Sequence, residues 1–373
     1  MKILQICHRF YPNVGGTEEL VMHLSKNFVE KDHDVTVITS QEPNTPEEEY
    51  ISGIRVIRIP LIHFAGKRIP KGYVQKVLSE KWDIVHLQGQ RVWSSDWLFP
   101  HLKKISCPKI FTPIGFYQLE MVGGPINWLY YHCWLAPMLK KFDKIIALTE
   151  KEKRTMLSWN IPEEKITSIP VGIEPKDFEK LPKGFKEKYD ITSEFVILYV
   201  GGFYENKRID RLIKAMKKIE EDYTLVIVGK DVKSRYNRNY CEKLSKELNV
   251  NVKFTGKISR EDVLSAYQCA DVFVLASQYE GFGIVLLESM ASGMPFVSTD
   301  AGAAKDLAEN GCGFIVKDEE EMRKIIKTLL NDAEMRKEMG KKGRIYVKEY
   351  AWDRIAKKHL SLYKVCNNSC KKP

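Results

Sequence analysis

The sequence predicts an α/β protein built from two doubly wound parallel-sheet domains in tandem. Its 373 residues correspond to two or three domains at about 150 residues each. Short apolar runs alternate with amphipathic stretches, which is typical of parallel sheets covered by helices. The alternation is interrupted once, by a stretch rich in Pro, Lys and Glu over residues 174–188, and then resumes. We expect this stretch to be a linker between domains at residues 1–174 and 189–350.

The composition excludes several classes of protein. The hydrophobic fraction of 44% is enough to bury a core, which excludes disorder of the whole chain. The 23 Gly and 16 Pro residues follow no period, which excludes collagen-like and low-complexity classes. The formal net charge of +10 suggests an anionic partner, such as a phosphate group or a membrane surface. The basic residues form no dense stripe, so we do not expect nucleic-acid binding.

Cysteine usage and the N-terminus indicate the compartment. The eight cysteines include no CxxC pair with metal-binding spacing. The chain does not open with the charged region and long apolar stretch of a signal peptide. We therefore expect a cytoplasmic protein, or one at the cytoplasmic face of a membrane. The polar tail that holds Cys366 and Cys370 is expected to be frayed.

The first domain is expected to begin with a strand at residues 3–6 and a loop that ends in a glycine pair. Thr17 is the expected N-cap of the helix that follows, because acidic residues come directly after it. Leu20, Leu24 and Phe28 recur at helical spacing and give this helix one buried face. Further strands are expected at residues 35–39, 55–59, 84–87, 110–111 and 144–148.

The second domain is expected to begin with a strand at residues 195–200 and a helix at residues 211–219. Its later strands are expected at residues 224–228, 252–254, 272–276, 296–298 and 314–316. In open parallel sheets, ligands bind at the carboxyl ends of the strands, where the strand order reverses. Two such domains that face each other would form a ligand-binding cleft.

One uncharged segment, residues 121–139, raises the question of a membrane. Its apolar part covers about 12 residues, which is too short to span a bilayer. Two interpretations stay open: a buried or partly buried helix, and an interfacial helix that touches lipid. Lys140, Lys141 and Lys144 follow directly and would suit an anionic membrane surface.

Gly15 and Gly16 form the first candidate site. They follow the first expected strand and precede a helix. Without Cβ atoms the backbone can approach a ligand closely, and the helix N-terminus offers free N–H groups to an anion. A glycine pair in an ordinary turn would look the same, so this signal alone is weak.

The strongest site signal lies in residues 277–288. An expected strand ends just before it, two glycines flank Phe282, and a helix is expected to begin near Gly283. Such glycines let backbone N–H groups point at a phosphate, and the helix dipole assists. Glu280 stands in the loop. Glu288 lies inside the helix, where a carboxylate can accept hydrogen bonds from a ribose diol.

A third candidate site, residues 200–208, also follows a strand and precedes a helix. Lys207 and Arg208 stand near the expected helix start, where the dipole disfavours cations. Positive charge at that place is explained if the partner is a diphosphate. By contrast, the sequence Asp32–Asp34 matches a metal-binding DxD pattern but lies in a turn at the amino-terminal edge of the sheet. We interpret it as a solvated turn and expect no metal site.

These motifs resemble the retaining glycosyltransferases of family 4, the group 1 transferases with the two-domain GT-B fold. The family's most specific mark, E-x7-E, is matched by Glu280 and Glu288 within YEGFGIVLLESMASGMPFV. Further matches lie at residues 11–19, 83–89, 165–178 and 350–353, and around Lys207. In the family the last helix, here residues 353–366, crosses back onto the N-terminal domain.

The resemblance implies a role for each candidate residue. A nucleotide-sugar donor would bind mostly to the C-terminal domain, and the acceptor would approach the N-terminal domain. Lys207 would neutralise the diphosphate, Glu288 would hold the ribose, and Glu280 would touch the donor sugar near its reacting carbon. The implied catalytic residues are Glu280 and Lys207. The implied donor-binding residues are Gly15, Gly16, Lys207, Arg208, Glu280, Gly281, Phe282, Gly283, Ile284 and Glu288. Transfer would retain the anomeric configuration without a bound metal or other cofactor.

The sequence departs from the family pattern at several positions. Gly202 stands where the family usually has Arg, and Arg208 is a candidate to compensate for it. Ile114 replaces a His that lies near the transferred sugar in relatives, and Ile cannot donate a hydrogen bond. Val171 and Asp306 replace the usual Asn and Glu.

The acceptor is expected to be a glycan or a lipid-linked molecule. Aromatic and basic side chains of the first domain could meet it at an anionic membrane surface: Trp128, Tyr130, Tyr131, Trp134, Lys67, Arg68, Lys71 and Lys76. The main alternative is a catalytically degenerate subunit that binds a nucleotide sugar within a glycan-assembly complex. A different enzyme of the same fold, an epimerase or a phosphorylase, is a further alternative.

Overall fold

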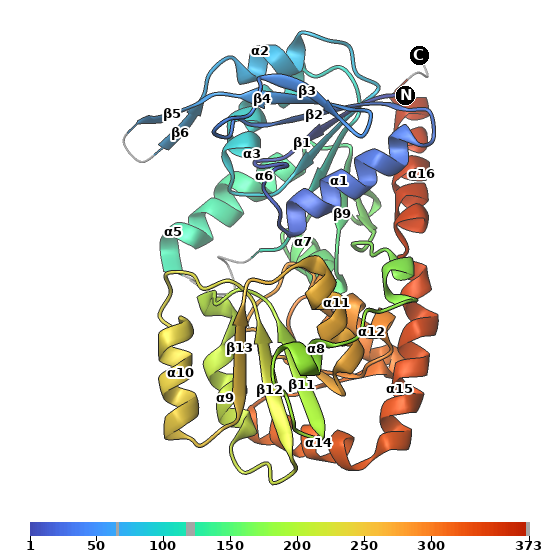
Figure 1. Ribbon diagram of the computed structural model, residues 1–373. Coiled ribbons are helices and arrows are strands. Elements are labelled where there is room, and N and C mark those ends of the chain that lie inside the picture. The colour runs from blue at the N-terminus through green and yellow to red at the C-terminus, as the bar shows by residue number, and fades with distance from the viewer. Residues whose placement is uncertain (65–66, 117–123, 371–373) are drawn as a thin grey trace. The chain divides into compact units, whose positions relative to one another are not determined.

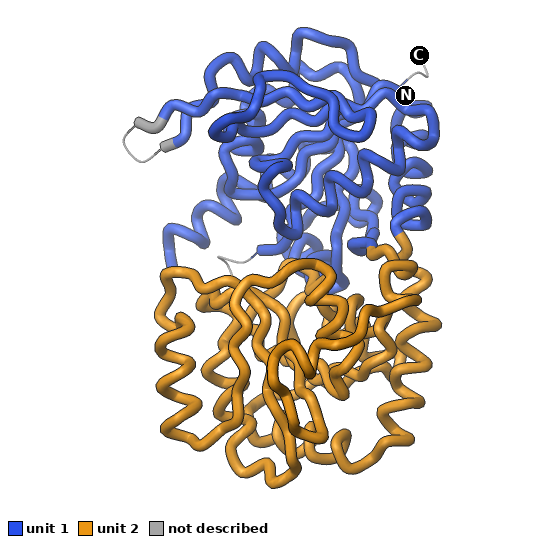
Figure 2. Tube along the Cα trace, in the orientation of Figure 1, with its two compact units in different colours: residues 1–172, 352–373 blue, residues 173–351 orange. Residues whose placement is uncertain are grey.

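A computed structural model of the chain describes residues 1–64, 67–116 and 124–370 (Figure 1). The chain divides into two compact units (Figure 2). Unit 1 consists of residues 1–172 together with residues 352–373, and unit 2 of residues 173–351. Among the described residues, no helix is both long enough and apolar enough to cross a bilayer.

The described part of unit 1 is built on an eight-stranded sheet of order β10-β9-β8-β7-β1-β2-β4-β3. Every pairing is parallel except that of β3 with β4 at the edge. The strands are β1 (Lys2–Ile6), β2 (Asp34–Ser40), β3 (Glu48–Ile51), β4 (Ile54–Ile59), β7 (Ile84–Gln88), β8 (Lys109–Thr112), β9 (Lys144–Ala147) and β10 (Ile166–Ser168). The central strands are buried along nearly their whole length, as expected for a parallel sheet covered on both faces.

Six strands and the first helix of unit 1 confirm the sequence predictions, and Leu20, Leu24 and Phe28 are buried. The prediction that Thr17 caps this helix is wrong. Helix α1 (Gly16–Val29) begins two residues earlier than predicted, and its N-cap is Gly15, which makes no side-chain cap bond. The other helices are α2 (Tyr73–Leu78), α3 (Trp93–Leu98), η1 (Phe99–Lys104), α5 (Gly124–Leu129), η2 (Tyr130–Leu135), α6 (Ala136–Leu139), α7 (Glu150–Ser158) and η3 (Glu163–Lys165).

The C-terminal helix α16 (Trp352–Cys370) belongs to unit 1 and packs beside α1 (Figure 1). The Tyr363 hydroxyl lies 2.6 Å from His86 Nδ1 in β7 and accepts a hydrogen bond from Gln5 Nε2 in β1 at 3.3 Å. The helix continues to Cys370, and Cys366 is buried. The prediction of a frayed tail is therefore wrong, because Cys366 lies on the packed face of the helix.

Unit 2 carries a six-stranded parallel sheet in its described residues, of order β13-β12-β11-β14-β15-β16. Its strands are β11 (Phe195–Val200), β12 (Tyr223–Val228), β13 (Val252–Gly256), β14 (Val272–Leu275), β15 (Phe296–Ser298) and β16 (Gly313–Ile315). All six confirm predicted strands. The helices are η4 (Pro175–Phe178), α8 (Phe185–Lys188), η5 (Glu205–Lys207), α9 (Ile209–Met216), α10 (Arg238–Glu247), α11 (Arg260–Cys269), α12 (Ile284–Ser292), α13 (Ala304–Leu307), η6 (Ala308–Cys312), α14 (Glu319–Asn331), α15 (Ala333–Tyr346) and η7 (Val347–Tyr350).

Two predictions for this half need correction. Residues 174–188 are part of unit 2 rather than a free linker, because Phe178 and Phe185 are buried. Helix α9 ends at Met216, three residues earlier than predicted, because Lys217 adopts a ψ of 132°, which is not helical.

The strand order reverses once in each unit. In unit 1 the chain leaves β1 for β2 and β4 on one side and returns to β7 on the other. In unit 2 it leaves β11 for β12 and β13 and returns to β14. The loops after β1 and β7, and those after β11 and β14, therefore diverge at the carboxyl edge of each sheet, which is where open α/β sheets bind ligands.

Candidate functional site

The two loops at the reversal point of unit 2 are joined by hydrogen bonds. Residues 201–208 follow β11, and residues 276–283 follow β14. The Gln278 amide N–H donates to the Asn206 carbonyl at 2.7 Å, and Asn206 Nδ2 donates to the Tyr279 carbonyl at 3.0 Å. Two segments about 70 residues apart in the sequence are thus held as one surface.

Lys207 and Glu280 meet on this surface. Lys207 Nζ donates to both carboxylate oxygens of Glu280, at 2.6 and 2.7 Å. The Ser277 hydroxyl donates to Glu280 Oε1 at 2.7 Å. The Glu280 side chain is 9% exposed and that of Lys207 19%, so the pair is shielded from most solvent. A shielded ion pair interacts more strongly than an exposed one and holds both charged groups in fixed places.

The backbone between Glu280 and α12 is fixed by glycines. Gly283 is the N-cap of α12 and has a φ of 94°, a left-handed conformation that favours glycine. Gly302, with a φ of 60°, packs so closely that an added Cβ would lie 2.4 Å from the Phe282 carbonyl oxygen. The first N–H groups of a helix have no partner within the helix. The N-terminus of α12 therefore faces the same edge as Lys207 with donors suited to an anion.

Glu288 is held by two side chains of α11. Its Oε1 accepts from Arg260 Nη1 at 2.5 Å, and its Oε2 accepts from the Tyr267 hydroxyl at 2.9 Å. Burial, followed by the nearby Glu288 charge, raises the pKa of Tyr267 well above its usual value, so this hydroxyl remains a donor. Sequence reasoning missed Arg260 and Tyr267, because no spacing rule links a helix in one βα unit to a residue in the next.

Arg208 and Gly202 lie in the same loop as Lys207, but they contact residues other than Lys207 and Glu280. The Arg208 guanidinium binds both carboxylate oxygens of Asp210, at 2.9 and 3.0 Å, and lies 5.2 Å from the ring centre of Tyr236. A Cβ atom added to Gly202 would lie 2.8 Å from the ring of Tyr204. The structure thus gives Arg208 a local partner, and its predicted role toward a ligand stays a prediction.

The predicted residues of unit 1 lie at that unit's own reversal point. Gly15 and Gly16 stand at the start of α1, and a Cβ added to Gly16 would meet open space. A Cβ on Gly15 would lie 2.7 Å from Oε2 of Glu18, whose carboxyl pKa is raised by burial. Ile114, just beyond β8, has a φ of 59°, which is an unusual and strained conformation for a β-branched residue. Backbone strain of this kind is concentrated at ligand-binding edges.

The DxD sequence is placed as predicted, in the turn that leads into β2 at the amino-terminal edge. In the part of the chain that the structure describes, no three His, Cys, Asp or Glu side chains gather as metal ligands.

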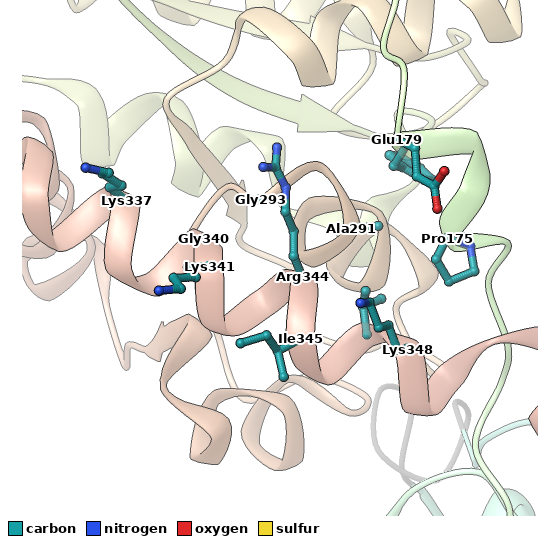
Figure 3. A pocket seen from close by; sticks show the side chains of 12 residues that line it. Pro175, Glu179, Ala291, Gly293, Lys337, Gly340, Lys341, Arg344, Ile345 and Lys348 are labelled. Carbon is teal, nitrogen blue, oxygen red and sulfur yellow. The ribbon is translucent and has the colours of Figure 1, made fainter.

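A separate pocket of 660 Å³ lies at the other end of α12 (Figure 3). Pro175 and Glu179 lie on one side of it, and Arg344 and Lys348 come from α15 and η7 on the other. Arg344 donates to the Ser292 carbonyl at 2.7 Å and thereby caps the C-terminus of α12. None of the predicted site residues lines this pocket. The pocket therefore lies at the C-terminal end of α12, whereas the candidate site lies at its N-terminal end.

Two protein-family models match the chain. The model of the family "Glycosyltransferase Family 4" matches residues 14–177, and that of "Glycosyl transferases group 1" matches residues 183–346. This chain belongs to the group 1 glycosyltransferases. The predictions of the family and of an enzyme of the hexosyltransferase type are thereby confirmed.

Several known proteins and solved structures are similar to this glycosyltransferase over most of its length. An uncharacterised glycosyltransferase of Methanocaldococcus jannaschii is 29% identical and covers 98% of each chain. A phosphatidylinositol N-acetylglucosaminyltransferase subunit of Saccharomyces cerevisiae is 23% identical over 83% of this chain and 70% of its own. Sucrose-phosphate synthase of Thermosynechococcus elongatus has a TM-score of 0.82, 23% identity and 99% coverage of both chains. Anabaena HepE with UDP and glucose has a TM-score of 0.77, 18% identity, and coverage of 98% of this chain and 100% of its own. The predicted GT-B fold is confirmed.

Proposed function

We propose that this glycosyltransferase moves a sugar from a nucleotide-diphosphate donor to an acceptor hydroxyl, with retention of the anomeric configuration and without a metal ion. The observation that carries the proposal is the Lys207–Glu280 pair at the reversal point of unit 2, beside the N-terminus of α12. Cations and N–H donors fixed at one edge suit a diphosphate leaving group, and a nearby carboxylate suits a sugar.

The Lys207–Glu280 pair has enough hydrogen-bonding capacity to bind a phosphate and a sugar hydroxyl at the same time. The Lys207 ammonium has three N–H donors, and two of them bind Glu280, which leaves one for a phosphate oxygen. Oε1 of Glu280 already accepts from Lys207 and Ser277, whereas Oε2 accepts from Lys207 and retains acceptor capacity for a sugar hydroxyl. As the sugar–phosphate bond breaks, charge grows on the leaving diphosphate. Lys207 and the N–H groups of α12 would stabilise that charge more in the transition state than in the ground state.

The donor's nucleoside would lie toward Glu288. Arg260 and Tyr267 hold the Glu288 carboxylate in place without using all of its acceptor capacity. A ribose diol could therefore donate hydrogen bonds to Glu288. Support for a nucleotide-sugar donor comes from HepE of Anabaena, whose structures hold UDP, UDP-glucose, or UDP and glucose.

We place the acceptor, a glycan or a lipid-linked molecule, with unit 1. Segment 124–139 supports a peripheral contact with an anionic membrane, because Ile126, Trp128 and Leu129 are exposed at 78%, 55% and 57%. Tyr131 and Leu135 of the same segment are buried, which fits the interpretation of a partly buried helix. Residues 121–123 and the side chain of Lys67 lie outside the described part of the chain.

Donor binding tests the proposal. The melting temperature of the full chain is measured with UDP-, GDP-, ADP- and dTDP-sugars, for the wild type and for Glu288→Gln. A ligand that binds only the native state raises the melting temperature by mass action. We expect a rise with one nucleotide family in the wild type and a smaller one in the variant. The proposal fails if no nucleotide sugar raises the melting temperature.

A catalytically degenerate subunit remains the second candidate, because Ile114 and Gly202 lack the polar groups that the family pattern has there. It predicts that a donor binds but is never cleaved, with or without acceptors. An epimerase would instead convert the free donor, and a phosphorylase would require inorganic phosphate, so product analysis separates all four.

A further inference from the structure

A pocket of 870 Å³ lies at the reversal point of unit 1. Its walls come from the loops after β1 and β7, from α3, from η2 and from the hairpin formed by β5 (Leu61–Phe64) and β6 (Lys67–Pro70). Aromatic side chains form much of the lining, and two arginines reach it: Trp93, Trp97, Tyr130, Trp134, Arg68 and Arg91. Such a pocket at this edge of an α/β sheet is the expected place for a small ligand.

The two arginines present positive charge to the pocket. Arg91 follows β7 with a left-handed φ of 55°, and its guanidinium lies 5.1 Å from the ring centre of Tyr130 and donates to Asn127. Arg68 is fixed through its backbone, because Trp97 Nε1 donates to its carbonyl at 3.1 Å. Among the described residues neither guanidinium forms a salt bridge with a carboxylate, although Asp96 also lines the pocket and its charge interacts with that of Arg91. Two arginines that line one pocket and form no salt bridge there suit an oxyanion that can accept several N–H bonds.

The remaining polar groups suit hydroxyls. Asp96 accepts from the Tyr130 hydroxyl at 2.9 Å, and burial raises the pKa of its carboxyl group. His8 Nδ1 is buried and has no hydrogen-bond partner in the described part of the chain. Burial lowers the pKa of His8 to about 4, so the ring is neutral and can exchange a hydrogen bond with a ligand hydroxyl. The carbonyl of His8 is anchored by Trp93 Nε1 at 3.1 Å and by the Ser40 hydroxyl at 2.8 Å.

We propose that this pocket binds the acceptor and that the acceptor is a hydroxylated ring, a sugar or a cyclitol, that carries a phosphate group. The phosphate would bind Arg68 and Arg91, the ring would stack on the tryptophans, and its hydroxyls would meet Asp96 and His8. The inference rests on the proposed function, because it assigns the acceptor of that reaction. A neutral glycan would leave both arginines without an anion, and a phosphate without a ring would leave the aromatic wall unused.

Equilibrium binding to the full chain tests this assignment. Tryptophan fluorescence and calorimetry are used with glucose 6-phosphate and myo-inositol 1-phosphate, each against its neutral counterpart. We expect at least one phosphorylated ring to bind tenfold or more tightly than its neutral form. Arg91→Gln and Arg68→Gln should each remove about tenfold or more of that affinity, as for a charge-assisted hydrogen bond. Arg154→Gln, which changes an exposed arginine of α7, should change nothing.

The donor provides an internal control. Arg91→Gln should keep the rise in melting temperature with the nucleotide sugar, and Lys207→Met should lose it while still binding the phosphorylated ring. Vesicles that contain phosphatidylinositol, compared with phosphatidylcholine vesicles, show whether the phosphate belongs to a lipid headgroup or to a soluble molecule. Either source supports the proposal.

Two results would overturn the proposal while leaving the proposed function intact. In one, no phosphorylated ring binds more tightly than its neutral counterpart. In the other, UDP displaces the ring and loses affinity in Arg91→Gln, which would make the pocket a nucleotide site. Loss of the donor response in the wild type, by contrast, refutes the proposed function and leaves ring binding as a separate observation.

Discussion

At Lys207 a single ammonium serves two partners in the proposed reaction, so its removal has a specific expected effect. In Lys207→Met the growing charge on the leaving diphosphate would lose its fixed cation. We expect transfer to fall by about 100-fold, a loss typical of removing one such stabilising group. Initial rates of donor consumption measure the effect. Lys243→Met on the exposed surface of α10 is the control and should keep wild-type rates. Equal rates in both variants would contradict the role of Lys207.

A substitution at Gly302 tests whether donor binding depends on the conformation of residues 280–283, without changing a charge. In Gly302→Ala the new Cβ would lie 2.4 Å from the Phe282 carbonyl and displace residues 280–283. We expect the donor-dependent rise in melting temperature to be lost. Gly184→Ala is matched to it, because Gly184 has a φ of 97° but open space around it, so only backbone strain of about 1 kcal/mol is added there. A normal donor response in Gly302→Ala would show that the loop geometry is unimportant.

The sequence predicted that Lys207 and Glu280 belong to the same site, and strand order explains why. The loops after the first and fourth strands of a doubly wound sheet lie side by side whatever their sequences, so motifs on them meet. Arg260 and Tyr267 were out of reach, because which side chain of one helix faces the next depends on packing. The same holds for the pairing of Arg208, whose backbone is left-handed, with Asp210.

Among the elements, α16 depends on a buried polar network. Tyr363→Phe would remove the hydroxyl that contacts both His86 and Gln5 and leave those groups without this partner. We expect a loss of about 1–3 kcal/mol in the free energy of unfolding of unit 1. Urea denaturation followed by circular dichroism measures it. Tyr346→Phe, at a half-exposed site in unit 2, should cost far less, and equal losses would show that the network contributes nothing.

The same network predicts a pH dependence with a definite sign. Burial lowers the pKa of His359 to about 4 and that of His86 well below its usual value. The unfolded histidines take up protons below about pH 6.5, whereas folded His359 does not until near pH 4 and the pKa of folded His86 lies well below its usual value. Their contribution to stability is therefore complete above pH 6.5 and is lost as the pH falls toward 4. Urea midpoints between pH 7.5 and 4.5 should fall less steeply in His359→Gln than in the wild type, and parallel curves would contradict this.

Apolar periodicity located the buried strands but not the edge elements. Strand β3 contains two glutamates and lies half exposed at the sheet edge, so it lacks the pattern of a buried strand. The β5–β6 hairpin lies outside the main sheets and was missed for the same reason.

For the molecule as a whole, the exposed apolar face of α5 predicts membrane binding. A double variant, Ile126→Ser with Leu129→Ser, changes side chains that are 78% and 57% exposed, so the fold should be kept. We expect co-flotation with anionic vesicles at low salt in the wild type and a several-fold reduction in the variant. Ile345→Ser, which changes an equally exposed residue of unit 2, serves as the control. A wild type that floats free of the vesicles would refute the membrane contact.

The central claim is that the reversal point of unit 2 binds and cleaves a nucleotide sugar with retention. Proton NMR of the full chain with the nucleotide sugar selected by the melting-temperature screen tests it most directly, with water or a phosphorylated ring as acceptor. We expect the anomer first released to keep the configuration of the donor, and we expect Glu280→Gln to abolish its release. Release of the inverted anomer, or unchanged cleavage in Glu280→Gln, would contradict the account.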